Sequence, residues 1–157
     1  MEESSINKIV RIKGNSMEPL INDGAITFCT VMKCYSVGDI IVFKYLQDGK
    51  NRIISHRIIY KEGDQYFCKG DNSFRIEKIT FDDILGKITA VLKNGKRMNI
   101  DMKDETIKLF CDLSKRCGEE WQKGNVETAQ ALGKRCYINM LKMCSALYKV
   151  EMNTECK

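Results

Sequence analysis

The sequence predicts an α+β protein in which a mainly-β domain, residues 1–100, is followed by an α-helical hairpin, residues 101–157. Two observations predict this architecture. Up to Ile100 the apolar residues form short runs rich in β-branched and aromatic side chains, and turn signals such as Asp48-Gly49 separate these runs. After Ile100 the apolar residues recur every three or four positions, which is typical of one face of a helix.

The first region is expected to contain six strands, at residues 8–13, 25–33, 39–45, 52–61, 65–69 and 87–93. Turn signals lie between several of them, at residues 22–24, 48–49 and 62–64. Short strands at this spacing are typical of an all-β barrel or sandwich.

The second region is expected to contain two helices joined at Gly124 and Asn125, a helix stop followed by a helix cap. The face of the first helix comprises Ile107, Phe110, Cys111, Ser114, Cys117 and Trp121. In the second, a seam of residues recurs in steps of four and three from Ala129 to Val150, and several of its members are small or sulfur-bearing. This seam fits either packing within the chain or a homodimer or partner-protein interface through residues 126–152.

The charge pattern argues against a nucleic-acid partner. The net charge of +5 comes from 26 basic and 21 acidic residues, which are spread over the whole chain with no basic run longer than two. A nucleic-acid-binding protein usually carries a basic stripe. We therefore expect a peptide or protein partner instead.

No membrane span or secretory signal is expected. The longest stretch without a charged residue runs from Gly24 to Met32, nine residues, whereas a spanning helix needs about 20. The first residues, MEESSINK, are acidic and polar. The sequence therefore predicts a cytoplasmic protein with reduced thiols, with peripheral association through a membrane partner left open.

The cysteines suggest neither a metal site nor a redox motif. None of the eight has C-x-x-C spacing, and the chain has a single histidine. Cys111, Cys117, Cys136 and Cys144 could still meet in space. We expect no metal and no cofactor.

Two residues are candidates for nucleophilic catalysis. Ser16 lies between Gly14 and Pro19, on constrained backbone that favours an exposed turn. His56, the only histidine, lies in an isoleucine-rich strand. Histidine is the side chain whose ordinary pKa is near neutrality, so any histidine base in this chain is His56.

Several short motifs, taken in order, resemble the type I signal peptidase family. They are Ser16-Met17-Glu18-Pro19, Gly38-Asp39 with the strand Ile40-Ile41-Val42-Phe43, His56-Arg57, Lys69-Gly70-Asp71-Asn72, and Ile84-Leu85-Gly86-Lys87-Ile88. The resemblance covers about residues 8–93 and is to the Ser-His branch of the endoplasmic reticulum, archaea and some Gram-positive bacteria.

This resemblance implies a serine endopeptidase that cuts a signal- or leader-type peptide after small side chains. Ser16 would be the nucleophile, its backbone N–H would help to stabilise the oxyanion, and His56 would be the general base. Alignment to the family motif places the acid that orients the base at Glu77, with Asp71 as the alternative.

The chain departs from the family pattern in three ways. Gly14 occupies a position that usually carries a small hydroxyl residue, and Glu77 replaces an aspartate. The sequence also contains no membrane anchor, so the substrate is open.

Two other functions are compatible with the motifs. The LexA-like autoproteases carry a similar Ser-Met-x-Pro motif with a lysine base, which makes a self-cleaving regulator the second candidate. An inactive homologue that only binds peptides is the third. Ala129-Gln130-Ala131 is the one Ala-x-Ala string, and we expect it to be helical and uncut.

Overall fold

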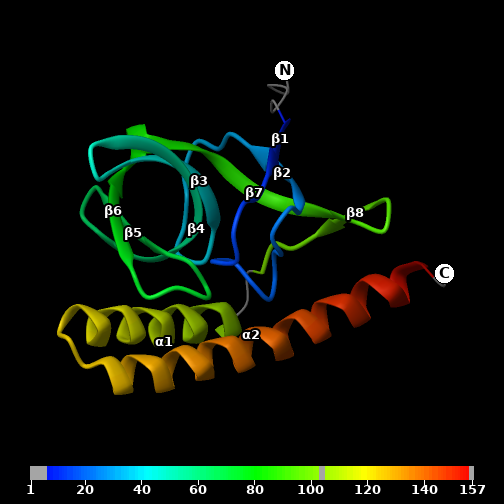
Figure 1. The fold of residues 1–157 in the computed structure, drawn as a ribbon. Coiled ribbons are helices and arrows are strands. Elements are labelled where there is room, and N and C mark those ends of the chain that lie inside the picture. The colour runs from blue at the N-terminus through cyan, green and yellow to red at the C-terminus, as the bar shows by residue number, and fades with distance from the viewer. Residues whose placement is uncertain (1–6, 103–104, 156–157) are drawn as a thin grey trace.

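The computed structural model describes residues 7–102 and 105–155, which form one antiparallel sheet and a helical hairpin (Figure 1). The elements in chain order are β1 (Asn7–Arg11), β2 (Ile26–Thr30), β3 (Ile40–Gln47), β4 (Lys50–Glu62), β5 (Gln65–Lys69), β6 (Ile76–Thr80), the 3-10 helix η1 (Phe81–Asp83), β7 (Ile84–Lys93), β8 (Lys96–Asn99), α1 (Glu105–Gln122) and α2 (Val126–Glu155). The predicted fold class is confirmed.

The strands follow the order β1-β2-β7-β3-β4-β5-β6, and β8 pairs with β7. Strands β3 to β6 curl into one half of the sheet, while β1, β2 and β8 lie on the other side (Figure 1). Strand β7 joins the two halves because it pairs with β2, β3 and β8. Strand β5 pairs with β4 on one side and with β6 on the other. The curl of the sheet lets an inward side chain of β4 contact one of β6.

The sequence located the six expected strands but missed β6 and β8. In β6 the inward-facing positions are Glu77 and Ile79, so a buried carboxylate interrupts the apolar alternation that identifies a strand. Strand β8 has four residues, of which Met98 alone is buried. A hydrophobic pattern cannot reveal strands of this kind.

The helical hairpin packs along one end of the sheet (Figure 1) and shares its hydrophobic core. A single buried cluster includes Ile12 and Met17 from the β region with Ile107, Phe110 and Met140 from the helices. The division at residue 100 therefore does not separate two cores, and the two-domain organisation stays a prediction.

The seam of the second helix packs inside the molecule. Ala129, Cys136 and Met140 are fully buried. The side chains that α2 exposes include Ile138 and Leu141, at 51% and 44% exposure, so an interface through residues 126–152, which stays a prediction, would use these outward residues.

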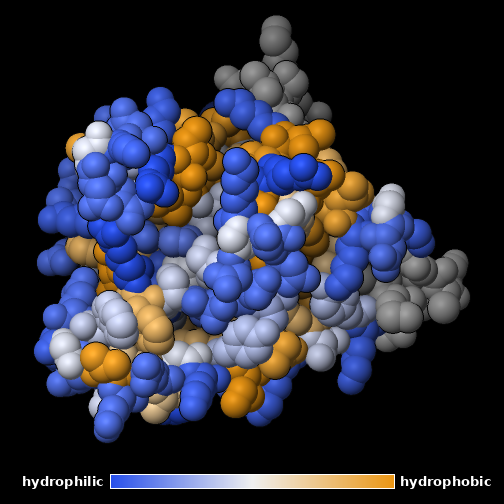
Figure 2. Space-filling model, in the orientation of Figure 1, coloured by the Kyte–Doolittle hydropathy of each residue, from blue (hydrophilic) through white to orange (hydrophobic). Residues whose placement is uncertain are grey.

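Hydrophilic residues cover most of the face in Figure 2, and hydrophobic ones gather toward β1, β2 and β7. Among the residues that the structure describes, no helix is long and apolar enough to cross a membrane.

Candidate active site

Ser16 lies in the turn-rich segment between β1 and β2. The segment is fixed by the fully buried Met17, whose carbonyl accepts a hydrogen bond from Ile21 N–H at 2.9 Å. Buried Met17 anchors the turn while Ser16 itself stays half-buried. The serine is thereby held on a fixed backbone while part of it remains accessible to solvent.

His56 lies in β4 and contacts Ser16 and Glu77 through its two ring nitrogens. Nε2 is 3.1 Å from Ser16 Oγ, and Nδ1 is 2.9 Å from Glu77 Oε2. A carboxylate oxygen accepts, so neutral His56 carries its proton on Nδ1 and donates it to Glu77. This leaves Nε2 as the acceptor for the Ser16 hydroxyl.

Glu77 reaches His56 from β6, two strands away from β4. Its side chain is 3% exposed and lies beside Cys68, its register partner on β5. Burial, and then the charge of Glu77, raise the pKa of the Cys68 thiol, so this thiol stays protonated. The neutral thiol does not compete for the carboxylate, whose hydrogen-bond partner is the His56 imidazole.

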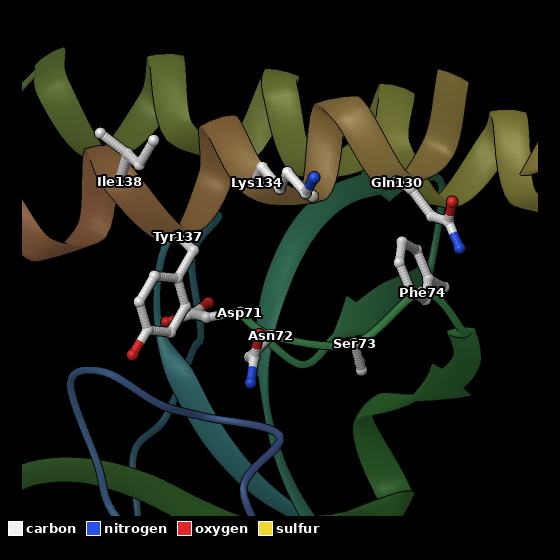
Figure 3. Close-up of a pocket in the computed structure, with 9 residues that line it drawn as sticks. Asp71, Asn72, Ser73, Phe74, Gln130, Lys134, Tyr137 and Ile138 are labelled. Carbon is white, nitrogen blue, oxygen red and sulfur yellow. The ribbon is translucent and has the colours of Figure 1, made fainter. Parts of the chain in front are cut away.

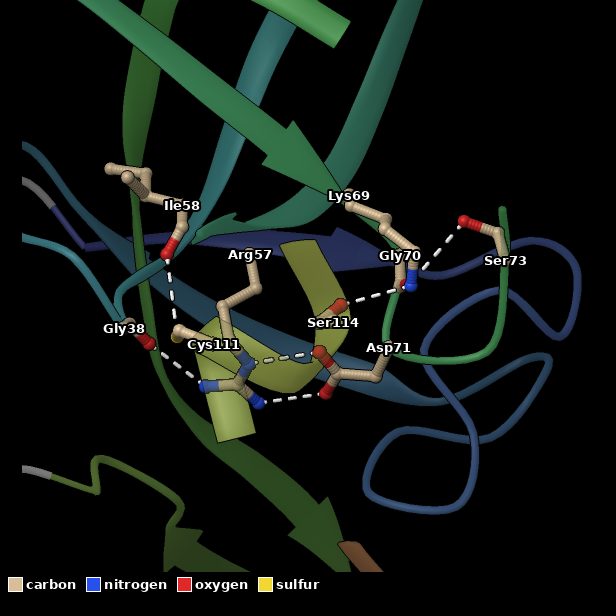
Figure 4. A network of polar contacts seen from close by, with 9 residues as sticks. All are labelled: Gly38, Arg57, Ile58, Lys69, Gly70, Asp71, Ser73, Cys111 and Ser114. Carbon is tan, nitrogen blue, oxygen red and sulfur yellow. Dashed lines mark hydrogen bonds and ion pairs between the residues drawn. The ribbon is translucent and has the colours of Figure 1, made fainter. Parts of the chain in front are cut away.

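Asp71 lies elsewhere and does not contact His56. Its carboxylate accepts hydrogen bonds from Arg57 Nε at 2.9 Å and Nη2 at 2.8 Å, and Arg57 Nη1 donates to Gly38 O at 2.8 Å (Figure 4). Burial alone would lower the Arg57 pKa, but the charge and hydrogen bonds of Asp71 raise it. The structure therefore brings Ser16, His56 and Glu77 together and leaves Asp71 in a separate ion pair.

This division follows from the period of β4. His56 and Arg57 are adjacent, so they point to opposite faces of the strand. Residue 56 faces β6 and the serine, and residue 57 faces α1, where its guanidinium lies 5.7 Å from the Phe110 ring centroid.

Gly14 provides no donor to the site. Its φ of +87° is a left-handed conformation that glycine adopts without strain, and its N–H donates to Asp23 Oδ1 at 2.7 Å. Glycine has no hydroxyl to replace the one in the family pattern, and its amide is already bonded to Asp23. Neither group is therefore available to an oxyanion hole. The backbone N–H of Ser16 stays the donor that the sequence predicts.

A cavity of about 710 Å³ adjoins the loop that follows β5 (Figure 3). Its walls are the loop residues Asp71, Asn72, Ser73 and Phe74 and the α2 residues Gln130, Gly133, Lys134, Tyr137 and Ile138. Asn72 also donates its backbone N–H to Ser16 O at 2.8 Å. The cavity therefore lies next to the segment that carries the serine.

Two thiols of the hairpin, Cys117 and Cys136, lie side by side in its interior. A hydrogen bond with Cys136 lowers the pKa of Cys117, although burial opposes this. Among the described residues no three His, Cys, Asp or Glu side chains lie close enough to hold a metal ion.

The comparison with protein families gives a match over more than half of the chain. The model of the family described as Peptidase S24-like matches residues 2–91, which include Ser16, His56 and Glu77. A search of the curated proteins finds no match for the chain. The family match supports the LexA-like relatives named above, whereas the type I signal peptidase assignment is not confirmed.

Proposed function

The chain belongs to the Peptidase S24-like family, and from this premise we propose that it is a serine endopeptidase with Ser16 as nucleophile, His56 as general base and Glu77 as the carboxylate that orients the base. The observation that supports this most directly is the continuous line of contacts, 3.1 Å from Ser16 Oγ to His56 Nε2 and 2.9 Å from His56 Nδ1 to Glu77 Oε2. Both distances are within the reach that proton transfer requires.

The reaction proceeds through an acyl-enzyme. His56 Nε2 takes the hydroxyl proton as Ser16 Oγ attacks the peptide carbonyl, and the Ser16 backbone N–H stabilises the oxyanion. The imidazolium then gives this proton to the leaving amine, and the peptide C–N bond breaks. Water, deprotonated by His56, hydrolyses the ester and restores Ser16. Glu77 accepts the hydrogen bond from Nδ1–H throughout the reaction and stabilises the positive charge that forms on the ring.

We propose a signal- or leader-type peptide as the substrate, cut after a small residue. Support for this comes from the ordered motifs shared with signal peptidases. Such a substrate binds in an extended conformation along a sheet edge, so it must be unfolded around the scissile bond.

The family match also favours a second candidate, a self-cleaving regulator. The Ala129-Gln130-Ala131 string argues against an internal site there, because it lies within α2 and Ala129 is fully buried, with its N–H donating to Asn125 O at 2.9 Å. A helical segment cannot bind as an extended strand. We therefore expect no cut after Ala131 while the hairpin is folded.

The experiment is to incubate the purified chain with a peptide library and to identify cuts by mass spectrometry. We expect cleavage after small residues by the wild type, none by Ser16→Ala or His56→Ala, and unchanged activity for Ser145→Ala, a matched serine variant on the exposed face of α2. Cleavage by Ser16→Ala would exclude this nucleophile. A wild type that cuts only itself would favour the regulator, and one that cuts nothing would favour the peptide-binding homologue.

A further inference from the structure

Lys69 is a buried cation at the end of β5 whose acceptors are both uncharged. The residue is 1% exposed, and its Nζ donates to Ser114 Oγ at 2.9 Å and to Gly70 O at 3.2 Å (Figure 4). The neighbouring carboxylate, Asp71, has both oxygens engaged by Arg57. Because a buried charge is costly unless it is hydrogen-bonded, Lys69 depends on the hydroxyl that α1 provides.

Gly70 connects this lysine to the proposed catalytic groups. A Cβ at Gly70 would come within 2.7 Å of Ser16 O and 3.0 Å of His56 Nε2, so the backbone here lies directly against the nucleophile and the base. The Gly70 carbonyl accepts from Lys69 and also from Ser73 N–H, at 3.1 Å. Any rotation of this peptide unit moves the surface on which Ser16 and His56 rest.

The loop after Gly70 is attached to the serine segment on its other side. Asn72 donates its backbone N–H to Ser16 O at 2.8 Å and its side-chain amide to Asn15 O at 3.1 Å. The loop at residues 70–73 is thus held by the serine segment at one end and by Lys69 with Ser114 at the other.

We propose that Ser114 and Lys69 form a positioning pair that fixes the loop at residues 70–73 against Ser16 and His56, so that the helical hairpin is part of the catalytic unit. This inference rests on the proposed function. Ser114 is the side chain of α1 that accepts a hydrogen bond from the Lys69 ammonium group. It is fully buried, so water cannot replace it without opening the contact between α1 and β5.

The pair acts on catalysis through geometry rather than through substrate binding. Loss of the Ser114 hydroxyl leaves the ammonium with Gly70 O alone, and the ammonium then shifts toward another acceptor and carries the carbonyl with it. A displacement of about 1 Å at the reacting groups costs about 100-fold in rate. We therefore expect kcat to fall while KM stays nearly constant.

The test compares Ser114→Ala, Lys69→Met and the double variant with Leu132→Ala as the control. Leu132 is a buried residue of α2, outside the network, and its truncation destabilises the hairpin. All rates are measured well below each variant's unfolding midpoint, on a peptide from the library. We expect a drop in kcat of about tenfold or more for Ser114→Ala, no further drop when it is added to Lys69→Met, and a kcat within about twofold of wild type for Leu132→Ala.

A second measurement does not depend on cleavage. His56 is the only histidine in the chain, so the ¹⁵N spectrum of its imidazole reports the site alone. We expect a single Nδ1-protonated form in the wild type and in Leu132→Ala, and shifted or doubled signals in Ser114→Ala.

Unchanged signals together with unchanged kcat in Ser114→Ala would overturn the positioning role, as would an equal change in Leu132→Ala. If the wild type cleaves no peptide, the proposed function fails by itself. The imidazole spectra of the same variants then still decide whether Ser114 positions His56.

Discussion

The β region and the helical hairpin bury different kinds of side chain. The β region buries two pairs of titratable groups, Glu77 with His56 and Asp71 with Arg57, and also Lys69, whose acceptors are uncharged. The hairpin buries thiols, thioethers and aliphatic groups, and the polar side chain that it contributes to the interior is Ser114. The β region therefore carries the buried charged groups, while the hairpin supplies apolar volume and a cover that keeps water from the buried ion pair.

The difference shows that the two regions depend on each other. An ion pair that water can reach contributes little to folding stability. Removing one partner of a buried ion pair is strongly destabilising, because the other charge stays buried without compensation. Arg57 and Asp71 are each 1% exposed because α1 covers them. Removing the cover and removing a charge are thus two ways to damage the same structure, and the following experiments separate them.

The largest effect is expected from truncation after Ile100. The division of the sequence into residues 1–100 and 101–157 predicts a β domain that folds without the hairpin. The shared core predicts the opposite, because Ile107, Phe110 and Met140 are buried against it and each such residue contributes about 2–5 kcal/mol. For these three residues the loss is about 6–15 kcal/mol, which is comparable with a typical folding free energy of about 5–15 kcal/mol. Circular dichroism and thermal denaturation of the fragment measure the result, and a cooperative transition in the fragment would restore the two-domain organisation.

Glu77→Gln is expected to lower activity strongly without unfolding the chain. Its amide can donate to Nδ1, which moves the imidazole proton to Nε2 and removes the acceptor for Ser16. We expect kcat to fall by about 10²–10⁴-fold with little change in KM. The ¹⁵N spectrum of the single histidine should show the other tautomer, and a wild-type tautomer combined with wild-type kcat would exclude Glu77 as the orienting group.

Asp71→Ala is expected to act mainly on stability. It leaves the buried Arg57 without its partner, which costs about 3–5 kcal/mol in the free energy of unfolding. Urea denaturation measures this loss. Replacing both partners, with Arg57→Met and Asp71→Ala, should recover part of it, and equal losses in the single and double variants would contradict the ion-pair interpretation.

The sequence predicted much of the fold and of the site because both produce local patterns. The strands with alternating or continuous apolar runs were found, and so was the change of period after Ile100. Ser16 and His56 were identified from residue type and motif order, and Glu77 from the resemblance alone. Their roles in catalysis stay predictions.

The remaining features have no local pattern. Strand β6 was missed because one of its two inward positions is Glu77, a charged residue. The choice between Asp71 and Glu77 depends on which face of β4 each carboxylate meets, and only the curl of the sheet determines this. The bond from Lys69 to Ser114 joins residues 45 positions apart, so no spacing rule indicates it.

A smaller effect on stability is expected at a close contact between α1 and β6. A Cβ at Gly118 of α1 would come within 2.6 Å of Ile76 Cγ1 and Cδ1, next to Glu77. Overpacking of this kind costs about 1–3 kcal/mol, and the better helix propensity of alanine offsets about 1 kcal/mol of it. Gly118→Ala should therefore lower the unfolding free energy slightly, whereas the exposed control Asn139→Ala should raise it. A stabilised Gly118→Ala would mean that the contact between α1 and β6 is loose.

The smallest effect concerns pH and a thiol of the hairpin. Burial, and then the charge of Asp71, raise the Cys144 pKa to about 11 from an ordinary value of 9.0. The unfolded chain therefore loses this proton first, so the stability that the neutral thiol contributes is complete below pH 9 and is lost as the pH rises toward 11. At pH 10 the loss in the free energy of unfolding is about 1 kcal/mol relative to pH 8.

Urea denaturation at the two pH values measures this loss. The difference in unfolding free energy should be smaller for Cys144→Ala than for wild type, while the exposed control Cys34→Ala should match wild type. An identical pH dependence in all three proteins would show that the hairpin interior admits water, and would remove the distinction between the two regions at this position.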